Sequence, residues 1–309
     1  MPKERKWYLN KDDVYLATDR LLKAEPLTTQ RLRPPEPSNQ KIGRTNTMDL
    51  NNKKVLITGG GAGIGRALVA ELVQRGVQDL AVVGRRPEPL QALATEFTGV
   101  RFLLLTADVS RAADLERVVA EVIDAWGGLD ILINNAGVVS AGLLTELSDE
   151  DIIQQIAVNL TGLILLTKKC LPLLQQSQEG AIMNISSGYG YIAMPFYSVY
   201  AATKAAVGQF SDAMRRELHQ YPIHVMTVYP AATATDMMKT AVVRNLDSAE
   251  DVAQAAVEGL LRRTINVVLG GPEREAQIRT NFLEPEKIDA VAIASFEALR
   301  ERTATHRSM

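Results

Sequence analysis

The sequence contains a single cysteine, Cys170, so no disulfide can form within the chain and no cluster of thiolate ligands can hold a metal. Its three histidines, His219, His224 and His306, show no metal-ligand spacing. Cys170 lies in the apolar helical pattern LILLTKKCLPLL, which favours a buried structural thiol over a nucleophile. The sequence therefore predicts no metal site, and histidines that are surface or packing residues.

The sequence also lacks a large excess of either charge, and it lacks a long apolar run. The net charge is only -2, which gives no reason to expect nucleic acid or anionic lipid as a partner. No apolar run reaches the roughly 18 to 20 residues that a membrane-spanning helix needs. The amino-terminal stretch MPKERKWYLN has no apolar signal core, and nearby acidic residues argue against a transit peptide. We expect a cytoplasmic protein that binds neither nucleic acid nor a membrane.

Residues 1–47 differ in composition from the rest of the chain. They are polar and slightly basic, with the proline-containing stretch RLRPPEPSNQ near their end. Such a segment buries little apolar surface, so we expect a flexible N-terminal extension ahead of a domain that starts at Met48. The alternative is an arm that docks on a partner subunit.

From Lys53 onward, short apolar runs alternate with amphipathic helical patterns. The expected strands are KKVLITGG, LAVVG, VRFLLLTAD, LDILINNAG, GAIMNISS, IHVMTVYP and INVVLG. Strands that are apolar throughout and alternate with helices indicate a parallel sheet covered on both faces. We therefore predict an α/β fold, a doubly wound parallel sheet of the Rossmann type, as a single domain over residues 48–272. Residues 273–309 are expected to form a connector and a helix.

The first expected strand ends in the glycine-rich loop TGGGAGIG, which opens directly into a helix. In doubly wound sheets, ligands bind outside the carboxyl ends of the strands. Glycines allow the backbone to approach a pyrophosphate, and the start of a helix supplies N–H donors to it. The spacing differs from the common G-x-G-x-x-G fingerprint. The predicted nucleotide-binding residues of this loop are Thr58, Gly59, Gly63, Ile64 and Gly65.

The end of the second strand indicates which dinucleotide binds. An acidic residue there would bind the ribose hydroxyls of NAD, but Asp79 lies at the opposite end of this strand. The ligand-binding end carries Arg85 and Arg86 instead. Because a guanidinium suits the 2′-phosphate of NADP, we favour NADP as the cofactor, with NAD as the alternative.

The third and fourth strands also end in residues that suit a nucleotide. Asp108, followed by Val109, offers a carboxylate that can accept a hydrogen bond from an adenine amino group. Asn135, Ala136 and Gly137 in the motif NNAG are small enough to let the backbone pass close to a ribose or nicotinamide. Each motif alone is equally typical of a turn, but together they favour a dinucleotide site.

Tyr200 and Lys204 lie four residues apart in the helical pattern VYAATKAAV, so they share one face of a helix. A free tyrosine has a pKa of about 10 and is a poor base at neutral pH. A nearby ammonium favours the phenolate and lowers that pKa. The pair is therefore a candidate for general acid/base chemistry on an alcohol or carbonyl.

Taken together, these motifs resemble the short-chain dehydrogenase/reductase family over about residues 50–270. The resemblance rests on T-G-x-x-x-G-x-G, D-V, NNAG, VNLTG, NISSG and Y-x-x-x-K, and the stretch SSGYGYIAMPFYSVYAATKAA is most similar to a DltE-like bacterial branch. It implies four catalytic residues. Ser187 would hold the substrate oxygen, Tyr200 would transfer the proton, and Lys204 would also bind the nicotinamide ribose. Asn159 would position a water that links Lys204 to solvent.

The chain departs from the family pattern in the loop after the sixth strand and in the glycine loop. Pro230 is followed by alanine where the family often has glycine, and Thr233 replaces a frequent valine. Thr235 stands where the family threonine contacts the cofactor, so Pro230, Thr233 and Thr235 are expected at the cofactor. Many NADP-dependent members carry a basic residue at the position of Ala62. Its absence leaves the 2′-phosphate to Arg85, helped by Arg86.

The resemblance implies an NADP-dependent oxidoreductase that interconverts a carbonyl and a secondary alcohol by hydride transfer. The alternative is a non-catalytic member of the same fold that senses the nucleotide or acts as a scaffold. Such members typically lose the tyrosine or the lysine, whereas this chain keeps both.

The substrate and the assembly are less defined by the sequence. The candidate lid AATATDMMKTAVVRNLDSAED contains Met237, Met238 and Val242, which favour a small or medium, moderately apolar carbonyl or alcohol substrate. A carrier-bound 3-oxoacyl group and a sugar-derived polyol remain open. Family members commonly form a homodimer or homotetramer through the helices that here contain Asn159 and Tyr200.

Overall fold

The computed structural model describes residues 47–238 and 246–308. Apart from Thr47, the predicted flexible extension lies outside the described residues. The same is true of Val242 in the candidate lid.

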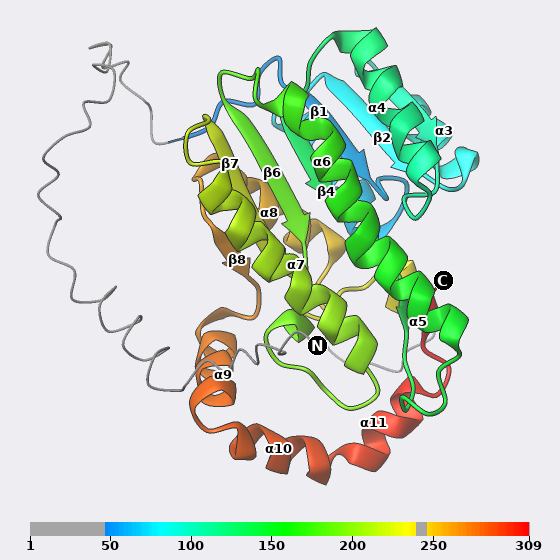
Figure 1. Cartoon of the computed structure of the whole chain (residues 1–309), viewed down its shortest axis with the longest axis vertical. Coiled ribbons are helices and arrows are strands. Elements are labelled where there is room, and N and C mark those ends of the chain that lie inside the picture. Colours follow the sequence, from blue (N-terminus) through cyan, green and yellow to red (C-terminus); the bar gives the residue numbers. More distant parts are fainter. Residues whose placement is uncertain (1–46, 239–245, 309) are drawn as a thin grey trace, which may run out of the picture. The chain divides into compact units, whose positions relative to one another are not determined.

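A parallel sheet of seven strands in the order β3-β2-β1-β4-β6-β7-β8 forms the centre of the described domain (Figure 1). The strands are β1 Lys54–Thr58, β2 Asp79–Gly84, β3 Arg101–Thr106, β4 Ile131–Asn134, β6 Gly180–Ile185, β7 Ile223–Tyr229 and β8 Asn266–Val268. The residues of β4 and β6 are buried throughout, which explains why these strands are apolar except for the buried Asn134 and Asn184. The predicted doubly wound α/β fold is confirmed. The strand order reverses between β1 and β4, so their carboxyl ends open a crevice.

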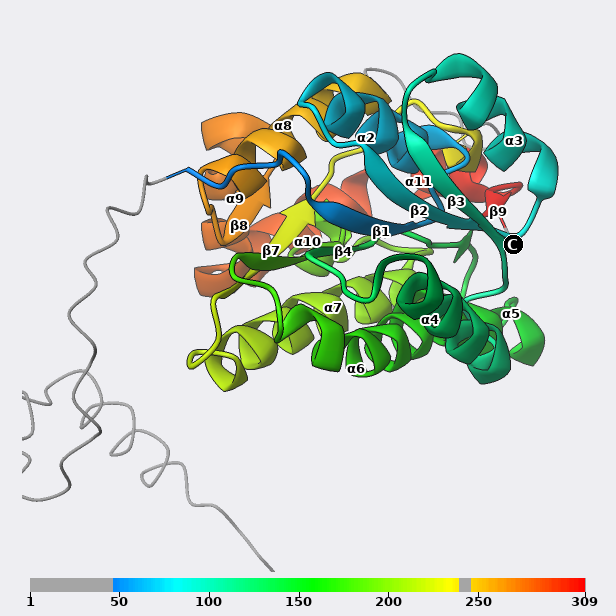
Figure 2. The same ribbon diagram turned by 90° about the horizontal axis from the view of Figure 1, so that it is seen from above.

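Helices cover both faces of the sheet (Figure 2). Helices α2 Gly63–Gln74, α3 Pro87–Glu96 and α8 Ala249–Leu261 pack on one face, and α4 Ala112–Trp126, α6 Leu163–Leu174 and α7 Ser198–Glu217 pack on the other. In β1, Val55 and Ile57 face the first layer while Leu56 faces the second, as alternation along a strand requires. Two apolar cores therefore hold the sheet rigid beneath its ligand-binding edge.

A long helical stretch packs on the second face. It consists of α5 Asp149–Ile156, the π-helical turn η1 Ala157–Gly162, and α6. By length and composition, Asp149–Leu174 is the one described helix that would suffice to cross a membrane, but 44% of its apolar window is buried inside the protein. Its contacts with α4, α7 and β4 are those of a core helix.

The C-terminal region differs from the expected connector and single helix. It forms three helices, α9 Gly271–Leu283, α10 Pro285–Ala294 and α11 Phe296–Thr303, followed by a short strand, β9 Arg307–Ser308. Prolines at the starts of α9 and α10 are compatible with the first turn of a helix, where no N–H is needed. Strand β9 pairs antiparallel with β5 Val139–Ser140. The chain end therefore returns to the residues that follow the NNAG motif.

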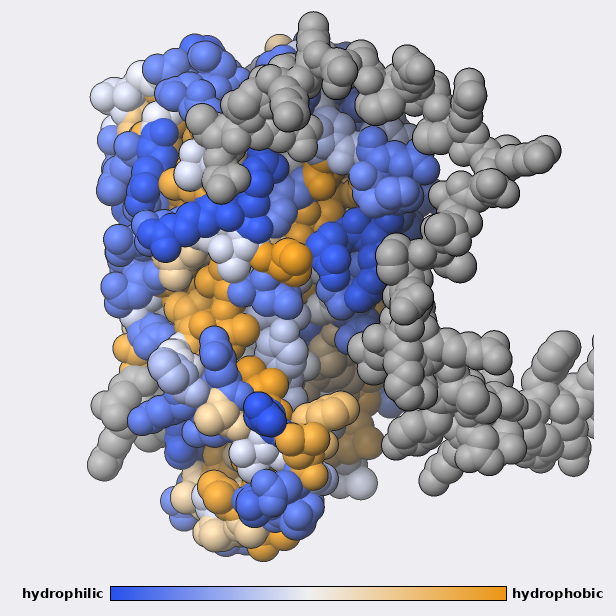
Figure 3. All heavy atoms as spheres, turned by 90° about the vertical axis from the view of Figure 1, so that its left-hand side faces the viewer, coloured by the Kyte–Doolittle hydropathy of each residue, from blue (hydrophilic) through white to orange (hydrophobic). Residues whose placement is uncertain are grey.

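Apolar side chains lie at the surface of α9 and α10, in the lower part of the face that Figure 3 shows. Phe282 is 85% exposed and Ile293 is 73% exposed. Helix α9 contains no buried residue among those described. These two helices therefore connect the domain to α11 with little burial of their own.

Candidate active site

A cleft of about 430 Å³ lies at the carboxyl ends of the strands, where the strand order reverses. It brings together every predicted site residue except Thr58 and Asn159. The predicted residues that line it are Gly59, Gly63, Ile64, Gly65, Arg85, Arg86, Asp108, Val109, Asn135, Ala136, Gly137, Ser187, Tyr200, Lys204, Pro230, Thr233 and Thr235. The described residues include no group of three or more His, Cys, Asp or Glu side chains that could hold a metal ion.

The glycine loop has a backbone that few other residues would permit. Gly59 and Gly63 have φ angles of +66° and +52°, in the left-handed region. A Cβ atom at Gly65 would lie 2.1 Å from the carbonyl oxygen of Gly59. Helix α2 begins at Gly63, and its N-cap residue Ala62 makes no side-chain hydrogen bond to the first turn. The N–H groups at the start of α2 thus remain available to an anion in the cleft.

Thr58 lies beneath the cleft and joins the ends of β1 and β4. Its hydroxyl oxygen accepts hydrogen bonds from the backbone N–H groups of Asn135 and Ala136, each at 3.1 Å. In return, the Asn135 side-chain amide donates to the carbonyl of Thr58 at 2.9 Å. Thr58 thereby positions two neighbouring cleft residues, and it does not face the cleft itself.

The two ends of β2 carry opposite charges. Arg85 and Arg86 follow its carboxyl end, are exposed, and line the cleft. Asp79 begins the strand and binds the Arg101 guanidinium through both carboxylate oxygens at 2.6 Å. The only charged groups that β2 presents to the cleft are therefore the two arginines. At the end of β3, Asp108 accepts hydrogen bonds from the backbone N–H and the hydroxyl of Ser110.

Tyr200 and Lys204 project from α7 toward Ser187, which follows β6. The Lys204 ammonium donates a hydrogen bond to the Ile185 carbonyl at 3.0 Å and lies 5.7 Å from the centre of the Tyr200 ring. Burial raises the pKa of Tyr200 to about 12, although a hydrogen bond with the Ser187 hydroxyl opposes the shift. Burial also lowers the pKa of Lys204 to about 8. In the protein alone, burial thus outweighs the lowering of the Tyr200 pKa that was expected from the lysine.

Asn159 lies in the π-helical turn η1, fully buried next to the cleft. Its carbonyl oxygen accepts from the backbone N–H of Val138 at 2.8 Å, and its amide donates to the Val138 carbonyl and to the Thr203 hydroxyl. The side chain is therefore engaged in holding the segment after β4 against α7. The carbonyl oxygen accepts one hydrogen bond here and has a second lone pair, so the role of Asn159 in positioning a water stays a prediction.

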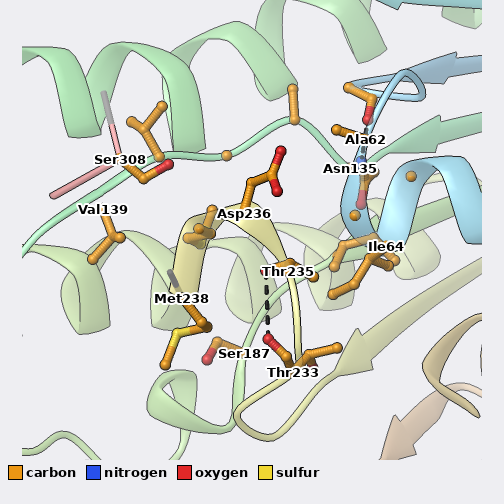
Figure 4. Close-up of a pocket in the computed structure, with 18 of the residues that line it drawn as sticks. Ala62, Ile64, Asn135, Val139, Ser187, Thr233, Thr235, Asp236, Met238 and Ser308 are labelled. Carbon is orange, nitrogen blue, oxygen red and sulfur yellow. Dashed lines mark hydrogen bonds between the residues drawn. The ribbon is translucent and has the colours of Figure 1, made fainter. Parts of the chain in front are cut away.

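The lid segment faces the glycine loop. Figure 4 shows Thr235 and Asp236 between the loop around Ala62 and Ile64 and the side chain of Ser187. A Cβ atom at Gly63 would lie 3.1 Å from the Thr235 methyl group. The predicted cofactor residue Thr235 thus lies directly against the glycine loop.

Sequence reasoning missed the residues that form the remaining wall of the cleft. They come from the C-terminal segment and are Leu299, Arg302, Thr303, His306 and Ser308. The Tyr197 hydroxyl and His306 Nδ1 are 2.7 Å apart, and His306 Nε2 lies 2.9 Å from the Met237 carbonyl oxygen. His306 is therefore a packing residue, as expected, but one at the cleft. The stretch TATHRS carries no motif or periodicity that would have indicated this position.

Comparison with known proteins identifies the family. The family model described as short chain dehydrogenase matches residues 53–245. The chain belongs to this family. As a short-chain dehydrogenase, it is an oxidoreductase that acts between an alcohol and a carbonyl. The likeness to the DltE-like branch stays a prediction.

Two relatives and one solved structure illustrate the range of this family. The chain is 33% identical to 2,5-dichloro-2,5-cyclohexadiene-1,4-diol dehydrogenase of Sphingobium indicum, over 62% of this chain and 77% of the relative. It is 34% identical to 3-oxoacyl-[acyl-carrier-protein] reductase of Bos taurus, over 67% and 90%. A short-chain dehydrogenase from Sphingobium yanoikuyae, solved in complex with NADPH, matches with a TM-score of 0.68 and 32% identity, covering 77% of this chain and 94% of the other. The named substrates differ widely, so family membership does not fix the substrate.

Proposed function

We propose that this short-chain dehydrogenase uses NADP to interconvert a carbonyl and a secondary alcohol, with Tyr200 as the general acid/base. The main observation behind the proposal is that nucleotide-binding and catalytic candidates line the same cleft. The glycine loop and Arg85 line part of it, and Ser187, Tyr200 and Lys204 line another part. A dinucleotide and a small substrate need these two sets of groups side by side.

The residues of the cleft fit NADP. The close approach of Gly59 and Gly65 and the free N–H groups at the start of α2 suit a pyrophosphate. Arg85, with Arg86, would hold the 2′-phosphate through charge-assisted hydrogen bonds. NADPH, when bound, supplies the hydride. The complex of the Sphingobium yanoikuyae neighbour with NADPH supports this choice, and NAD remains the alternative.

Further contacts would hold the rest of the cofactor. Asp108 and Val109 would contact the adenine, and Lys204 would bind the nicotinamide ribose, as in the family the sequence resembles. Thr235 would contact the cofactor from the lid, since it already lies against the glycine loop.

The protein's own contribution to the chemistry is to hold the substrate oxygen and move one proton. Ser187 would donate a hydrogen bond to that oxygen, and Tyr200 would give its phenolic proton to it during reduction. A pKa of about 12 keeps this proton on Tyr200 until the carbonyl oxygen gains charge. In the oxidation direction, Tyr200 would take the proton from the alcohol. That direction requires positive charge from the Lys204 ammonium and the oxidised nicotinamide to lower the pKa.

The lining of the cleft near Tyr200 favours a moderately apolar substrate of small or medium size. Tyr189, Tyr197, Met237 and Leu299 all line it. We also propose a homodimer or homotetramer, as is common in the family. A non-catalytic sensor or scaffold is the second candidate, and the retention of Tyr200 beside Ser187 weighs against it.

The test is titration of the purified protein with NADPH and with NADH, followed by the fluorescence of the reduced nicotinamide. We expect tighter binding of NADPH. Arg85→Ala should weaken NADPH binding by about tenfold or more, because a charge-assisted hydrogen bond contributes about 1.5–3 kcal/mol, and should leave NADH binding nearly unchanged. Arg262→Ala, at an exposed arginine of the chain outside the cleft, is the control. Preference for NADH would overturn the NADP assignment, and binding of neither would count against an enzyme.

A further inference from the structure

The C-terminal segment of this chain forms a wall of its own active-site cleft. After α11, the chain returns to β5, where Ser140 pairs with Arg307 and Val139 with Ser308. Figure 4 shows Ser308 next to Val139 at the edge of the cleft. We call residues 296–308 the C-terminal wall. It closes the cleft beside Tyr197 and the lid residue Met237.

Several hydrogen bonds and the close ion pair of Arg307 fix this wall. The Arg307 guanidinium binds the Asp151 carboxylate at 2.6 Å, and the backbone N–H of Ala141 donates to the His306 carbonyl at 2.9 Å. Because the Met237 carbonyl can only accept, His306 Nε2 must carry the proton that it donates. His306 Nδ1 is then an acceptor, and the Tyr197 hydroxyl donates to it. The wall therefore has a fixed position relative to α7, which begins directly after Tyr197 and carries Tyr200.

Arg302 gives the substrate part of the cleft a positive charge. It lines the cleft from α11, and its charge acts on the nearby phenols of Tyr189 and Tyr197. Burial raises the pKa of both phenols, and Arg302 opposes that shift. Tyr189 in turn contacts Tyr200, with ring centres 6.3 Å apart. Arg302 is thus placed close to the aromatic side chains that surround the proton-transferring tyrosine.

A second arginine adds to this positive region. The Arg274 guanidinium, from α9, packs against the backbone next to Ser187, since a Cβ atom at Gly188 would lie 2.6 Å from its Nη2. Arg274 donates to the neutral side-chain oxygen of Gln277 at 3.2 Å, and its charge also acts on Tyr189. Two carboxylates also line the cleft, that of Asp108 at the end of β3 and that of Asp236 on the lid beside Thr235.

We propose that Arg302 binds a carboxylate of the substrate, so that the substrate class is a ketone or secondary alcohol with an apolar body and an acidic group. The inference rests on the proposed function and narrows the moderately apolar substrate named there. A guanidinium has five N–H donors in a planar fork that matches a carboxylate, so Arg302 can bind one while it keeps contacts within the chain. The aromatic and aliphatic side chains around it would contact the apolar body.

The test compares two probes of the same shape that differ in charge. Binding of 4-phenylbutanoate and of 4-phenylbutanamide to the full chain saturated with NADPH is measured by calorimetry. We expect the carboxylate to bind about tenfold or more tightly than the amide, since a hydrogen bond to a charged group contributes about 1.5–3 kcal/mol. Arg302→Gln should remove this preference, and Arg302→Lys should keep only part of it because a lysine cannot bind in the same forked geometry.

The matched control is Arg300→Gln. Arg300 lies on the same helix, does not line the cleft, and pairs with Glu146 at 3.8 Å, so the preference should persist in this variant. Equal binding of both probes, binding of neither, or a preference that survives Arg302→Gln would overturn the inference. NADPH affinity, measured in every variant, reports whether the fold and the cofactor site are intact.

A kinetic comparison separates this inference from the proposed function. The rate of NADPH oxidation is measured with 4-phenyl-2-oxobutanoate and with its ethyl ester. A higher kcat/KM for the acid, lost in Arg302→Gln, supports the inference. Equal reduction of both compounds would overturn the inference while the reductase function stands. If NADPH does not bind to the wild-type protein, the proposed function fails instead.

Discussion

Lys204 lies one helical turn after Tyr200, and its ammonium is held 5.7 Å from the centre of the tyrosine ring by a hydrogen bond to the Ile185 carbonyl. Lys204 is buried and Tyr200 is partly buried at the cleft, so burial disfavours the charged form of each. The pKa of Lys204 falls to about 8 while that of Tyr200 rises to about 12. At neutral pH the pair therefore consists of a neutral phenol and a lysine with a lowered pKa, and under the proposed function the oxidised cofactor would supply the remaining positive charge.

The buried lysine predicts a pH-dependent stability. The unfolded chain, with a lysine pKa of 10.5, binds the Lys204 proton more tightly than the folded chain does, with a pKa of about 8. The free energy of unfolding should thus gain a contribution on the order of 3 kcal/mol as pH rises from 8 toward 10.5. Lys204→Met removes this dependence. Chemical denaturation of both proteins without cofactor at pH 7 and pH 9.5 measures it.

The quantity to follow is the difference in the free energy of unfolding between the wild type and Lys204→Met. Cys170, whose pKa is raised by burial to about 12, also titrates abnormally, but it is present in both proteins and cancels. Lys204→Met should be relatively more stable at pH 7 than at pH 9.5. A stability difference that does not vary with pH would mean that Lys204 keeps its ordinary pKa.

Removal of the Tyr200 hydroxyl should abolish most of the activity. General acid/base catalysis contributes about 10²- to 10⁴-fold, so Tyr200→Phe should lower kcat/KM by that factor. The affinity for NADPH should change little, because phenylalanine retains the ring. Tyr191→Phe is a suitable control, since Tyr191 stacks on Tyr229 and does not line the cleft. Equal activity of the two variants would exclude Tyr200 as the proton donor.

The sequence predicted the sheet well because its central strands are buried on both sides. Such strands are apolar at most positions, and they alternate with amphipathic helices, so both patterns are visible in the amino-acid letters. The ligand-binding edge was equally predictable, because the carboxyl ends of parallel strands lie on one side. Arg85 and Asp79 could be assigned to opposite ends of β2 on this ground alone.

The remaining part of the site depends on contacts that leave no local pattern. Strands β5 and β9 have two residues each, too few for an alternation to be seen. His306 meets Tyr197 across 109 positions of the sequence. The contacts of Asn159 with the backbone of Val138 and the Thr203 hydroxyl likewise leave no local pattern, and its expected role in holding a water stays a prediction.

The hydroxyl of Thr58 predicts a stability effect beneath the cleft. Thr58→Val keeps the shape of the side chain but leaves the N–H groups of Asn135 and Ala136 without their acceptor. Each unpaired buried group costs about 1–3 kcal/mol, so this variant should lose about 2 kcal/mol or more and bind NADPH more weakly. Thr58→Ser retains the hydroxyl and should stay close to the wild type. Thermal unfolding of both variants gives the comparison, and equal Tm values would contradict the assigned role.

His306 and Tyr197 provide the last prediction, which concerns the C-terminal wall. His306→Leu removes the acceptor of the Tyr197 hydroxyl and the donor to Met237, so the wall should loosen beside the substrate. We expect KM for a ketone to rise by about tenfold. The affinity for NADPH should stay the same, because the His306 ring makes its hydrogen bonds to Tyr197 and Met237, which are not predicted cofactor residues. His219→Leu, at an exposed histidine, is the control.

A double-mutant cycle shows whether the hydrogen bond itself is responsible. The stability changes of His306→Leu, Tyr197→Phe and the double variant should be non-additive by about 0.5–3 kcal/mol, because the two side chains bind each other. Tyr197→Phe alone should raise KM in the same direction, since the wall then loses one of its attachments to α7. If the two single changes add within about 0.5 kcal/mol, the Tyr197–His306 contact does not hold the wall, and the C-terminal segment is fixed mainly by the pairing of β5 with β9 and the ion pair of Arg307 with Asp151.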